Sequence, residues 1–231
     1  SRGQADDGSF SKQTGTAVTA LAVQAILEHR PEALQQPAVQ KALRFIESNI
    51  QPDGGIYRPG SKYRNYETAV SVMALIRANE DGKYDSALER AEGFLKDLQW
   101  DEGEGIESGD TAYGGAGYGG SSRPDLSNTS FLIDALRELG NDADDESIQK
   151  ALTFVLRTQN LPPTEVPDGR GNDTKYGDAI GDGGFYYTPA AGGQSKAGET
   201  ESGGLRSYGS MTYAGLRSMI YAGLTADDPL V

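Results

Sequence analysis

The chain has 231 residues, a net charge of −13, 31 glycines and no cysteine. Domains average roughly 150 residues and no apolar run approaches the roughly 20 residues of a bilayer span, so we expect one domain over 1–231 and no membrane span. The acidic balance argues against binding to nucleic acid, and the lack of cysteine excludes disulfides, thioesters, thiol nucleophiles and thiolate metal sites.

A short sequence motif that begins with threonine and continues with small and apolar residues recurs along the chain. Each copy predicts a helix that is apolar around most of its circumference. The copies begin at Thr16, Thr68, Thr129 and Thr212. The first three are followed by amphipathic segments that carry one aromatic residue and a charged face, over 37–50, 84–98 and 144–158. This alternation predicts inner helices covered by outer helices, stacked in an arc or closed in a ring.

Both ends of the chain look like interrupted repeats. The Gly-containing turn that follows the outer segments also occurs at 4–10, where no helical segment precedes it. Residues 227–231 contain the Asp and Pro that commonly open a helix. We therefore expect a piece of a longer repeat protein, completed by a missing chain segment or by a protein partner.

The connections from outer to inner helices lengthen along the chain and are rich in Gly and Tyr, whereas those from inner to outer helices stay short. Parallel inner helices would gather the long loops at one end, here called the mouth. Function commonly lies where insertions gather on a rigid scaffold, so we expect a cavity under these loops. The alternative is that the tyrosines only pack the loops onto the rim.

The segments Phe94–Gln99 and Phe154–Gln159, joined to Gly-rich turns, resemble the QW-type repeats of squalene-hopene cyclases and protein prenyltransferase β subunits. The motif is degenerate, because only Gln99 is followed by tryptophan and Gln51 stands one residue further from its aromatic, Phe45. The resemblance implies an all-α fold: an α/α toroid, or a partial one, of alternating inner and outer helices with long Gly-rich loops at one end.

The catalytic residues that the resemblance implies are altered. The prenyltransferase zinc site needs a cysteine, which this chain lacks. Class II terpene cyclases carry an Asp-x-Asp-Asp-Thr motif at the start of an inner helix, and 125–129 is the matching segment. Ser127 and Asn128 replace its second and third Asp, which leaves Asp125 as the catalytic candidate. An N-cap role for Asp125 is the alternative.

The candidate site is expected at the mouth. Besides Asp125, the residues expected to contact a ligand are Tyr66, Glu67, Tyr118, Arg123, Asn128, Tyr208 and Met211. No cofactor is expected. The one metal candidate is calcium, for which Asp168, Asn172 and Asp173 offer oxygen donors without the EF-hand pattern, and a solvated acidic loop is the alternative.

Together these features favour a binding scaffold that holds an apolar or isoprenoid-like ligand in the central cavity. An enzyme at the mouth is the first alternative, either terpene-cyclase-like through Asp125 or polysaccharide-lyase-like through tyrosine and arginine. A protein-interaction module is the second, because the open edge of an incomplete ring exposes apolar surface. The composition favours an extracytoplasmic, periplasmic or secreted, location.

Overall fold

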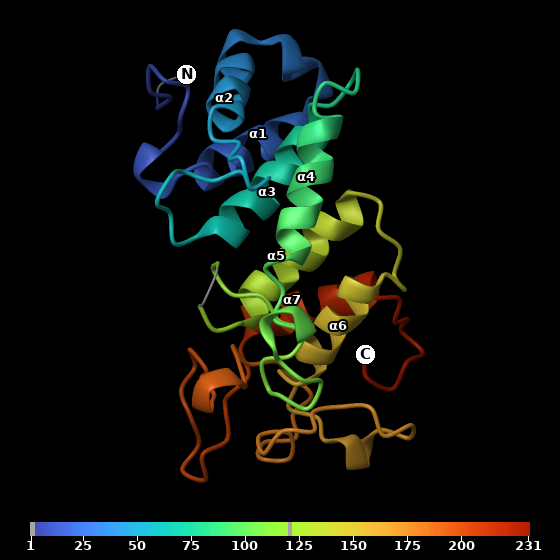
Figure 1. The fold of residues 1–231 in the computed structure, drawn as a ribbon. Helices are drawn as coiled ribbons and strands as arrows, with labels where there is room; N and C mark the ends of the chain where they lie inside the picture. The colour runs from blue at the N-terminus through green and yellow to red at the C-terminus, as the bar shows by residue number, and fades with distance from the viewer. Residues whose placement is uncertain (1–2, 120–121) are drawn as a thin grey trace. The chain divides into compact units, whose positions relative to one another are not determined.

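The computed structural model describes residues 3–119 and 122–231 (Figure 1). Regular structure in these residues is helical, and the extended segments form isolated β-bridges in place of strands. The predicted all-α fold class is confirmed. The chain divides into two compact units, which are described separately. None of the helices in the described ranges has the length and apolar character needed to cross a membrane.

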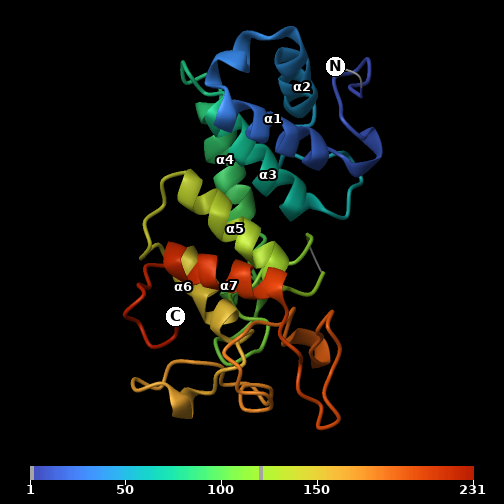
Figure 2. The same ribbon diagram turned by 180° about the vertical axis from the view of Figure 1, so that it is seen from behind.

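The first unit contains α1 (Ala17–His29), α2 (Pro37–Glu47), α3 (Arg64–Arg77) and α4 (Asp85–Lys96). Helix α1 packs against both α2 and α3, and α3 packs against α4 (Figures 1 and 2). Every residue of α3 from Glu67 to Leu75 is buried, as expected for an inner helix that is covered on all sides. Helix α2 buries only one stripe, which includes Val39, Leu43 and Ile46, as expected for an outer helix.

The second unit contains α5 (Leu126–Glu138, of which Glu138 itself clusters with the first unit), α6 (Glu146–Leu156) and α7 (Gly209–Tyr221). Helix α5 is buried around most of its circumference, whereas α6 is amphipathic and packs against α7. The inner and outer helix types predicted from the sequence therefore occur in both units. The rest of the second unit consists of long irregular connections.

Helices α3, α5 and α7 begin three or four residues before the predicted threonine, whereas α1 begins at Ala17, directly after Thr16. In each of the four helices, a threonine inside the helix makes the same hydrogen bond. Its hydroxyl accepts a hydrogen bond from the backbone N–H of the residue that follows each Gly-containing turn. The donor and acceptor pairs are Phe10 and Thr19 (2.9 Å), Ile56 and Thr68 (3.0 Å), Ala116 and Thr129 (3.0 Å), and Phe185 and Thr212 (3.2 Å). The prediction that Thr16 is the first repeat threonine is thus wrong, because Thr19 makes the shared bond.

The glutamines that close the outer segments connect successive parts of the fold. Each of three side-chain amides donates to a glycine carbonyl of the following turn and to a carbonyl of a later segment. These bonds join Gln4 to Gly8 and Ala38, Gln99 to Gly114 and Ser147, and Gln159 to Gly183 and Leu230. Gln51 instead donates to Asn49 and Tyr57, in keeping with its shifted position after Phe45.

Candidate functional site

The start of α5 holds the catalytic candidate, Asp125, in a buried position. One carboxylate oxygen accepts the backbone N–H of Asn128 at 2.9 Å, and the other accepts its side-chain amide at 2.8 Å. The first of these bonds is the hydrogen bond of a helix N-cap, so the capping alternative for Asp125 has the geometry that it requires. Asn128 serves as the partner of this carboxylate.

Residues from a distant connection complete the surroundings of Asp125. The Tyr187 hydroxyl also hydrogen-bonds the carboxylate. The backbone N–H of Leu126 donates to the Tyr187 carbonyl at 2.8 Å, and the Thr188 hydroxyl donates to the Pro124 carbonyl at 2.8 Å. The segment at 187–188 therefore fixes the residues on both sides of Asp125.

Burial sets the protonation behaviour of this cluster. Loss of hydration raises the pKa of Asp125, against the opposing effects of the Asn128 and Tyr187 hydrogen bonds and of the nearby Arg123 charge. Burial also raises the pKa of Tyr208 to about 12, with a contribution from the Asp125 charge. The Tyr208 phenol is consequently neutral at ordinary pH and can offer a hydrogen-bond donor and an apolar ring face.

Cationic side chains lie at the edge of this cluster. Arg123 donates to the side-chain oxygen of Gln194, to which Lys196 also donates at 3.3 Å. The Lys196 ammonium lies 4.6 Å from the centroid of the Tyr187 ring, within cation–π distance. Met211 is buried in the first turn of α7. The second unit thus brings Asp125, Asn128, Arg123 and Tyr208 into one neighbourhood.

The first unit contains the remaining predicted ligand contacts, and Glu67 is buried there as a structural group. Its carboxylate accepts the backbone N–H groups of Thr16 at 3.0 Å and Arg58 at 2.9 Å, and also the Ser61 hydroxyl. Gly15 lies directly against it, with φ +65°, and an added Cβ would stand 2.0 Å from a Glu67 oxygen. These contacts join the start of α1 to the start of α3.

Tyrosines surround the start of α3. Tyr118 packs edge-on against Tyr63, with 5.2 Å between ring centroids, and its carbonyl accepts the backbone N–H of Asn65 at 3.0 Å. Tyr66 is half-buried, and burial raises its pKa. A polar cavity of about 230 Å³ lies beside Glu67 and is also lined by Arg58, Ser61 and Tyr63. Its volume is below the roughly 300–1,000 Å³ of pockets for drug-sized ligands.

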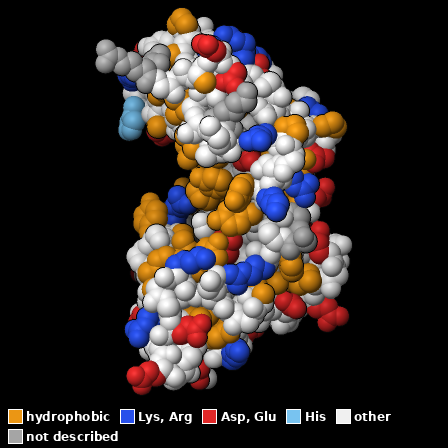
Figure 3. Space-filling model, turned by 90° about the vertical axis from the view of Figure 1, so that its left-hand side faces the viewer, with side chains coloured by type: hydrophobic (Ala, Val, Ile, Leu, Met, Phe, Trp, Pro, Cys, Tyr) orange, Lys and Arg blue, Asp and Glu red, His pale blue; other side chains and the backbone are white. Residues whose placement is uncertain are grey.

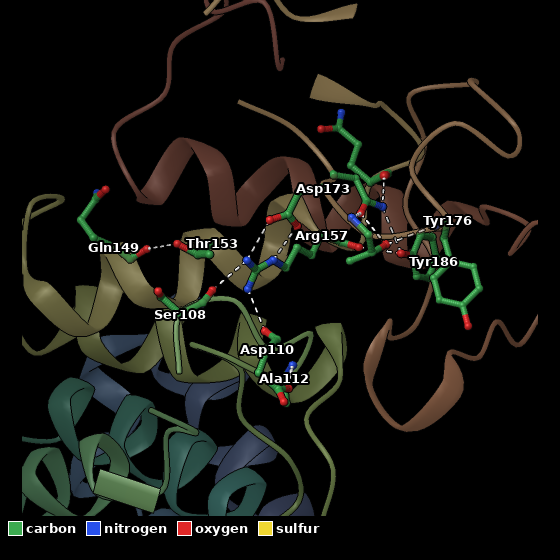
Figure 4. A network of polar contacts seen from close by, with 12 residues as sticks. Ser108, Asp110, Ala112, Gln149, Thr153, Arg157, Asp173, Tyr176 and Tyr186 are labelled. Carbon is green, nitrogen blue, oxygen red and sulfur yellow. Dashed lines mark hydrogen bonds and ion pairs between the residues drawn. The ribbon is translucent and has the colours of Figure 1, made fainter. Parts of the chain in front are cut away.

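The calcium candidates have other partners in the second unit. Asp173 forms a two-pronged ion pair with the buried Arg157, at 2.7 and 2.9 Å (Figure 4). Asp168 pairs with Arg170 at 2.6 Å. The side-chain oxygen of Asn172 accepts the Thr174 backbone N–H at 3.0 Å and its hydroxyl at 2.7 Å. The described ranges contain no group of three or more His, Cys, Asp or Glu side chains placed to hold a metal, and the calcium site, which includes Asn172, stays a prediction.

Arg157 holds the connections of the second unit together instead. Its guanidinium donates to the carbonyls of Ser108 and Asp110, each at 2.8 Å, and its own carbonyl accepts the Tyr186 hydroxyl at 2.6 Å (Figure 4). Burial raises the pKa of Tyr186 to about 12, and the Arg157 hydrogen bonds lower the pKa of Asp173. The network joins α6 to connections that lie before and after it in the sequence.

The family model of the squalene-hopene cyclase C-terminal domain matches residues 4–181. This match covers more than half of the chain. The chain belongs to this family. A search of curated proteins found no match.

Membership in the squalene-hopene cyclase C-terminal domain family confirms the resemblance drawn from the repeats and supports an α/α toroid class of fold. Within the match, 125–129 remains the segment that resembles the cyclase acid motif. Ser127, at the position of the proton donor, is half-buried, and its carbonyl accepts the Ser130 hydroxyl at 2.9 Å. The family match by itself does not decide activity, because a fold can be retained without its chemistry.

The sequence analysis did not single out Tyr187 or Gln194 as functional residues. Tyr187 was only one of several tyrosines in a Gly-rich segment, and no local pattern ties it to Asp125. The predicted contacts divide between Tyr66, Glu67 and Tyr118 in the first unit and the other residues in the second unit. A common site for all of them stays a prediction.

Proposed function

We propose that this chain is a non-catalytic, ligand-binding member of the squalene-hopene cyclase C-terminal domain family, with an apolar or isoprenoid-like ligand. The observation that carries the proposal is the state of Asp125, the one carboxylic acid left in the acid-motif segment. It is buried, and both of its oxygens accept hydrogen bonds from Asn128.

The hydrogen bonds of Asp125 argue against cyclase chemistry. Protonation of an alkene needs a carboxylic acid held with its proton toward the double bond. Both Asp125 oxygens instead accept hydrogen bonds from Asn128, so this carboxylate serves as a helix cap. A serine hydroxyl at position 127 is a far weaker acid than a carboxylic acid, so Ser127 does not replace the missing donor.

The remaining side chains suit binding without reaction. Tyr208 is a half-buried phenol with a raised pKa, and Met211 adds a polarizable apolar side chain. Groups of this kind offer apolar surface together with a few directed hydrogen bonds, the usual composition of a small-molecule pocket. An isoprenoid alcohol or hydrocarbon fits this chemistry better than a highly charged ligand.

The proposal is tested by incubating the purified chain with squalene or farnesol, followed by binding measurements and mass spectrometry of the extracted lipid. We expect saturable binding and recovery of the isoprenoid unchanged. Tyr208→Ala should weaken binding several-fold, whereas Tyr213→Ala, at an exposed position outside the Asp125 cluster, should not. Cyclised products, or binding absent from the wild-type chain, would refute the proposal.

A second candidate function is an enzyme that uses Asp125 with its neighbours. A buried carboxyl with a raised pKa, close to the Tyr187 and Tyr208 hydroxyls and to the Arg123 charge, is a common arrangement at catalytic sites. A polysaccharide-lyase-like reaction would give unsaturated sugars with ultraviolet absorbance on acidic polysaccharides. Turnover that Asp125→Asn abolishes would favour the enzyme over the binding protein.

A further inference from the structure

The polar cavity beside Glu67 is separate from the surroundings of Asp125. It is lined by the segments 13–15 and 58–63 together with Glu67, all of which belong to the first unit, whereas Asp125 belongs to the second. Its volume of about 230 Å³ is too small for a drug-sized ligand and leaves room for a small polar molecule. The side chains that line it show which chemistry such a molecule needs.

Glu67 places a buried carboxylate on the cavity wall, where the residue is 1% exposed. One carboxylate oxygen accepts the backbone N–H groups of Thr16 and Arg58, and the other accepts only the Ser61 hydroxyl. A carboxylate has about four acceptor positions, so the second oxygen can accept one more hydrogen bond. The wall therefore favours a ligand that carries hydrogen-bond donors.

Two cationic side chains, those of Arg58 and Lys62, line the same cavity from exposed positions. Within 3–119 and 122–231, neither of them forms an ion pair with Asp or Glu, although the chain has a net charge of −13. A phosphate dianion in the cavity would meet the charge of Glu67, and a simple cation would meet the two basic side chains. A ligand with one anionic group and several neutral donors satisfies both kinds of charge.

An aromatic ring also lines this cavity. Tyr63 is 55% exposed, and its ring packs edge-on against Tyr118, with 5.2 Å between ring centroids. The connection that carries Tyr63 lies on the left of Figure 1, and on that side of the first unit hydrophobic and basic side chains lie next to one another (Figure 3). An exposed phenol ring held in this way offers an apolar face to a flat ligand.

We propose that this cavity binds a sugar acid, that is, a hexuronate. A hydroxyl of the sugar donates to the available acceptor position of Glu67, and the sugar carboxylate lies beside Arg58 and Lys62. The apolar face of the sugar ring stacks on Tyr63. A neutral sugar would leave the two cations without a partner, and a small amino acid would leave the aromatic ring unused. This inference does not depend on the proposed isoprenoid ligand.

Calorimetric titration of the purified chain with glucuronate, glucose and cyclohexanecarboxylate tests the assignment of the ligand. We expect saturable binding of glucuronate that weakens as salt is added, because exposed charges are screened. Glucose lacks the carboxylate and cyclohexanecarboxylate lacks the hydroxyls. Each should bind about tenfold more weakly than glucuronate or worse, because each leaves one set of polar partners unused.

A double variant, Arg58→Gln with Lys62→Gln, tests whether glucuronate binds in this cavity. Both side chains are exposed, so the fold should be retained, and binding should weaken about threefold or more. The matched control is Lys175→Gln with Arg206→Gln, which removes two exposed cations of the second unit and changes the net charge equally. The control should bind glucuronate like the wild type.

A second pair of variants tests the aromatic ring. Tyr63→Ala should weaken glucuronate binding about threefold or more, because the stacking surface is lost. Tyr213→Ala removes a tyrosine of α7 that is 67% exposed and should leave the affinity unchanged. Circular dichroism of every variant verifies that helix content is retained.

The proposal is overturned if the wild-type chain does not bind glucuronate, or if it binds glucose or cyclohexanecarboxylate equally well. It is also overturned if the Arg58 and Lys62 double variant binds glucuronate like the wild type, because the binding site then lies elsewhere. None of these results decides whether squalene or farnesol binds, which is measured separately.

Discussion

Replacing Arg157 with glutamine tests whether one buried guanidinium fixes the connections of the second unit. The Arg157 side chain is 6% exposed, and it donates to the carbonyls of Ser108 and Asp110 and to Asp173. The Asp173 side chain is 57% exposed, so water screens that ion pair and it contributes about 0–1 kcal/mol. Each bond from the cation to a carbonyl contributes about 1.5 kcal/mol or more, so the two together give a loss of about 3 kcal/mol.

Urea unfolding followed by Trp100 fluorescence measures this loss, because the single tryptophan of the chain lies in the second unit. Arg170→Gln is the matched control, since it removes a partly exposed arginine that pairs with Asp168 and Asp228. We expect the control to lower the free energy of unfolding by less than about 1 kcal/mol. If Arg157→Gln and Arg170→Gln agree within about 0.5 kcal/mol, the network does not stabilise the unit as argued.

Three further predictions concern single positions. Gly215→Ala should lower the melting temperature, because the added methyl group would lie 2.3 Å from the Phe185 ring. Gly93→Ala, whose added methyl group would have nothing within 4 Å, should instead raise the free energy of unfolding by about 0.5–1 kcal/mol. Calorimetry of both variants measures the two melting temperatures. Glu67→Ala should reduce the free energy of unfolding in urea by about 2–3 kcal/mol, because the backbone N–H groups of Thr16 and Arg58 would lose the carboxylate oxygen that accepts both of them. An unchanged value would contradict the assigned bonds. The pKa of Asp173 is lower in the folded state than in the unfolded state, which adds stability that is complete above the unfolded pKa of about 3.9 and is lost as the pH falls through the folded pKa. Asp173→Asn should therefore make the free energy of unfolding decrease less steeply on the acid side of a pH series. An unaltered slope would count against the ion pair.

Periodicity was sufficient to predict the helix types. The apolar stripe of Val39, Leu43 and Ile46 predicted an outer helix, and the apolar circumference around Thr68 predicted an inner one. Periodicity did not show which threonine of the first repeat is equivalent to Thr68, Thr129 and Thr212, because Thr16 and Thr19 both fit the sequence motif. Only the hydrogen bond from the Phe10 backbone N–H distinguishes them, and that bond depends on how the preceding turn folds.

Less of the candidate site than of the fold could be predicted from the sequence. The acid-motif resemblance located Asp125 and its capping alternative, because both follow from residues within three positions of it. The contact of Tyr187 with Asp125 and the burial of Glu67 depend on segments that are distant in the sequence, so no local sequence pattern indicates them. The shared mouth and the ligand contacts stay predictions, since the predicted residues are divided between two separately described units.

The bond between a backbone N–H and the repeat threonine has a consequence for engineering. Its two residues are 9, 12, 13 and 27 positions apart in the four repeats, yet the same atoms meet each time. Closing a loop three times as long adds only about 1 kcal/mol of entropy cost. Foreign peptides inserted between Phe185 and Thr212 should therefore be tolerated, which makes this segment the place to graft new recognition sequences.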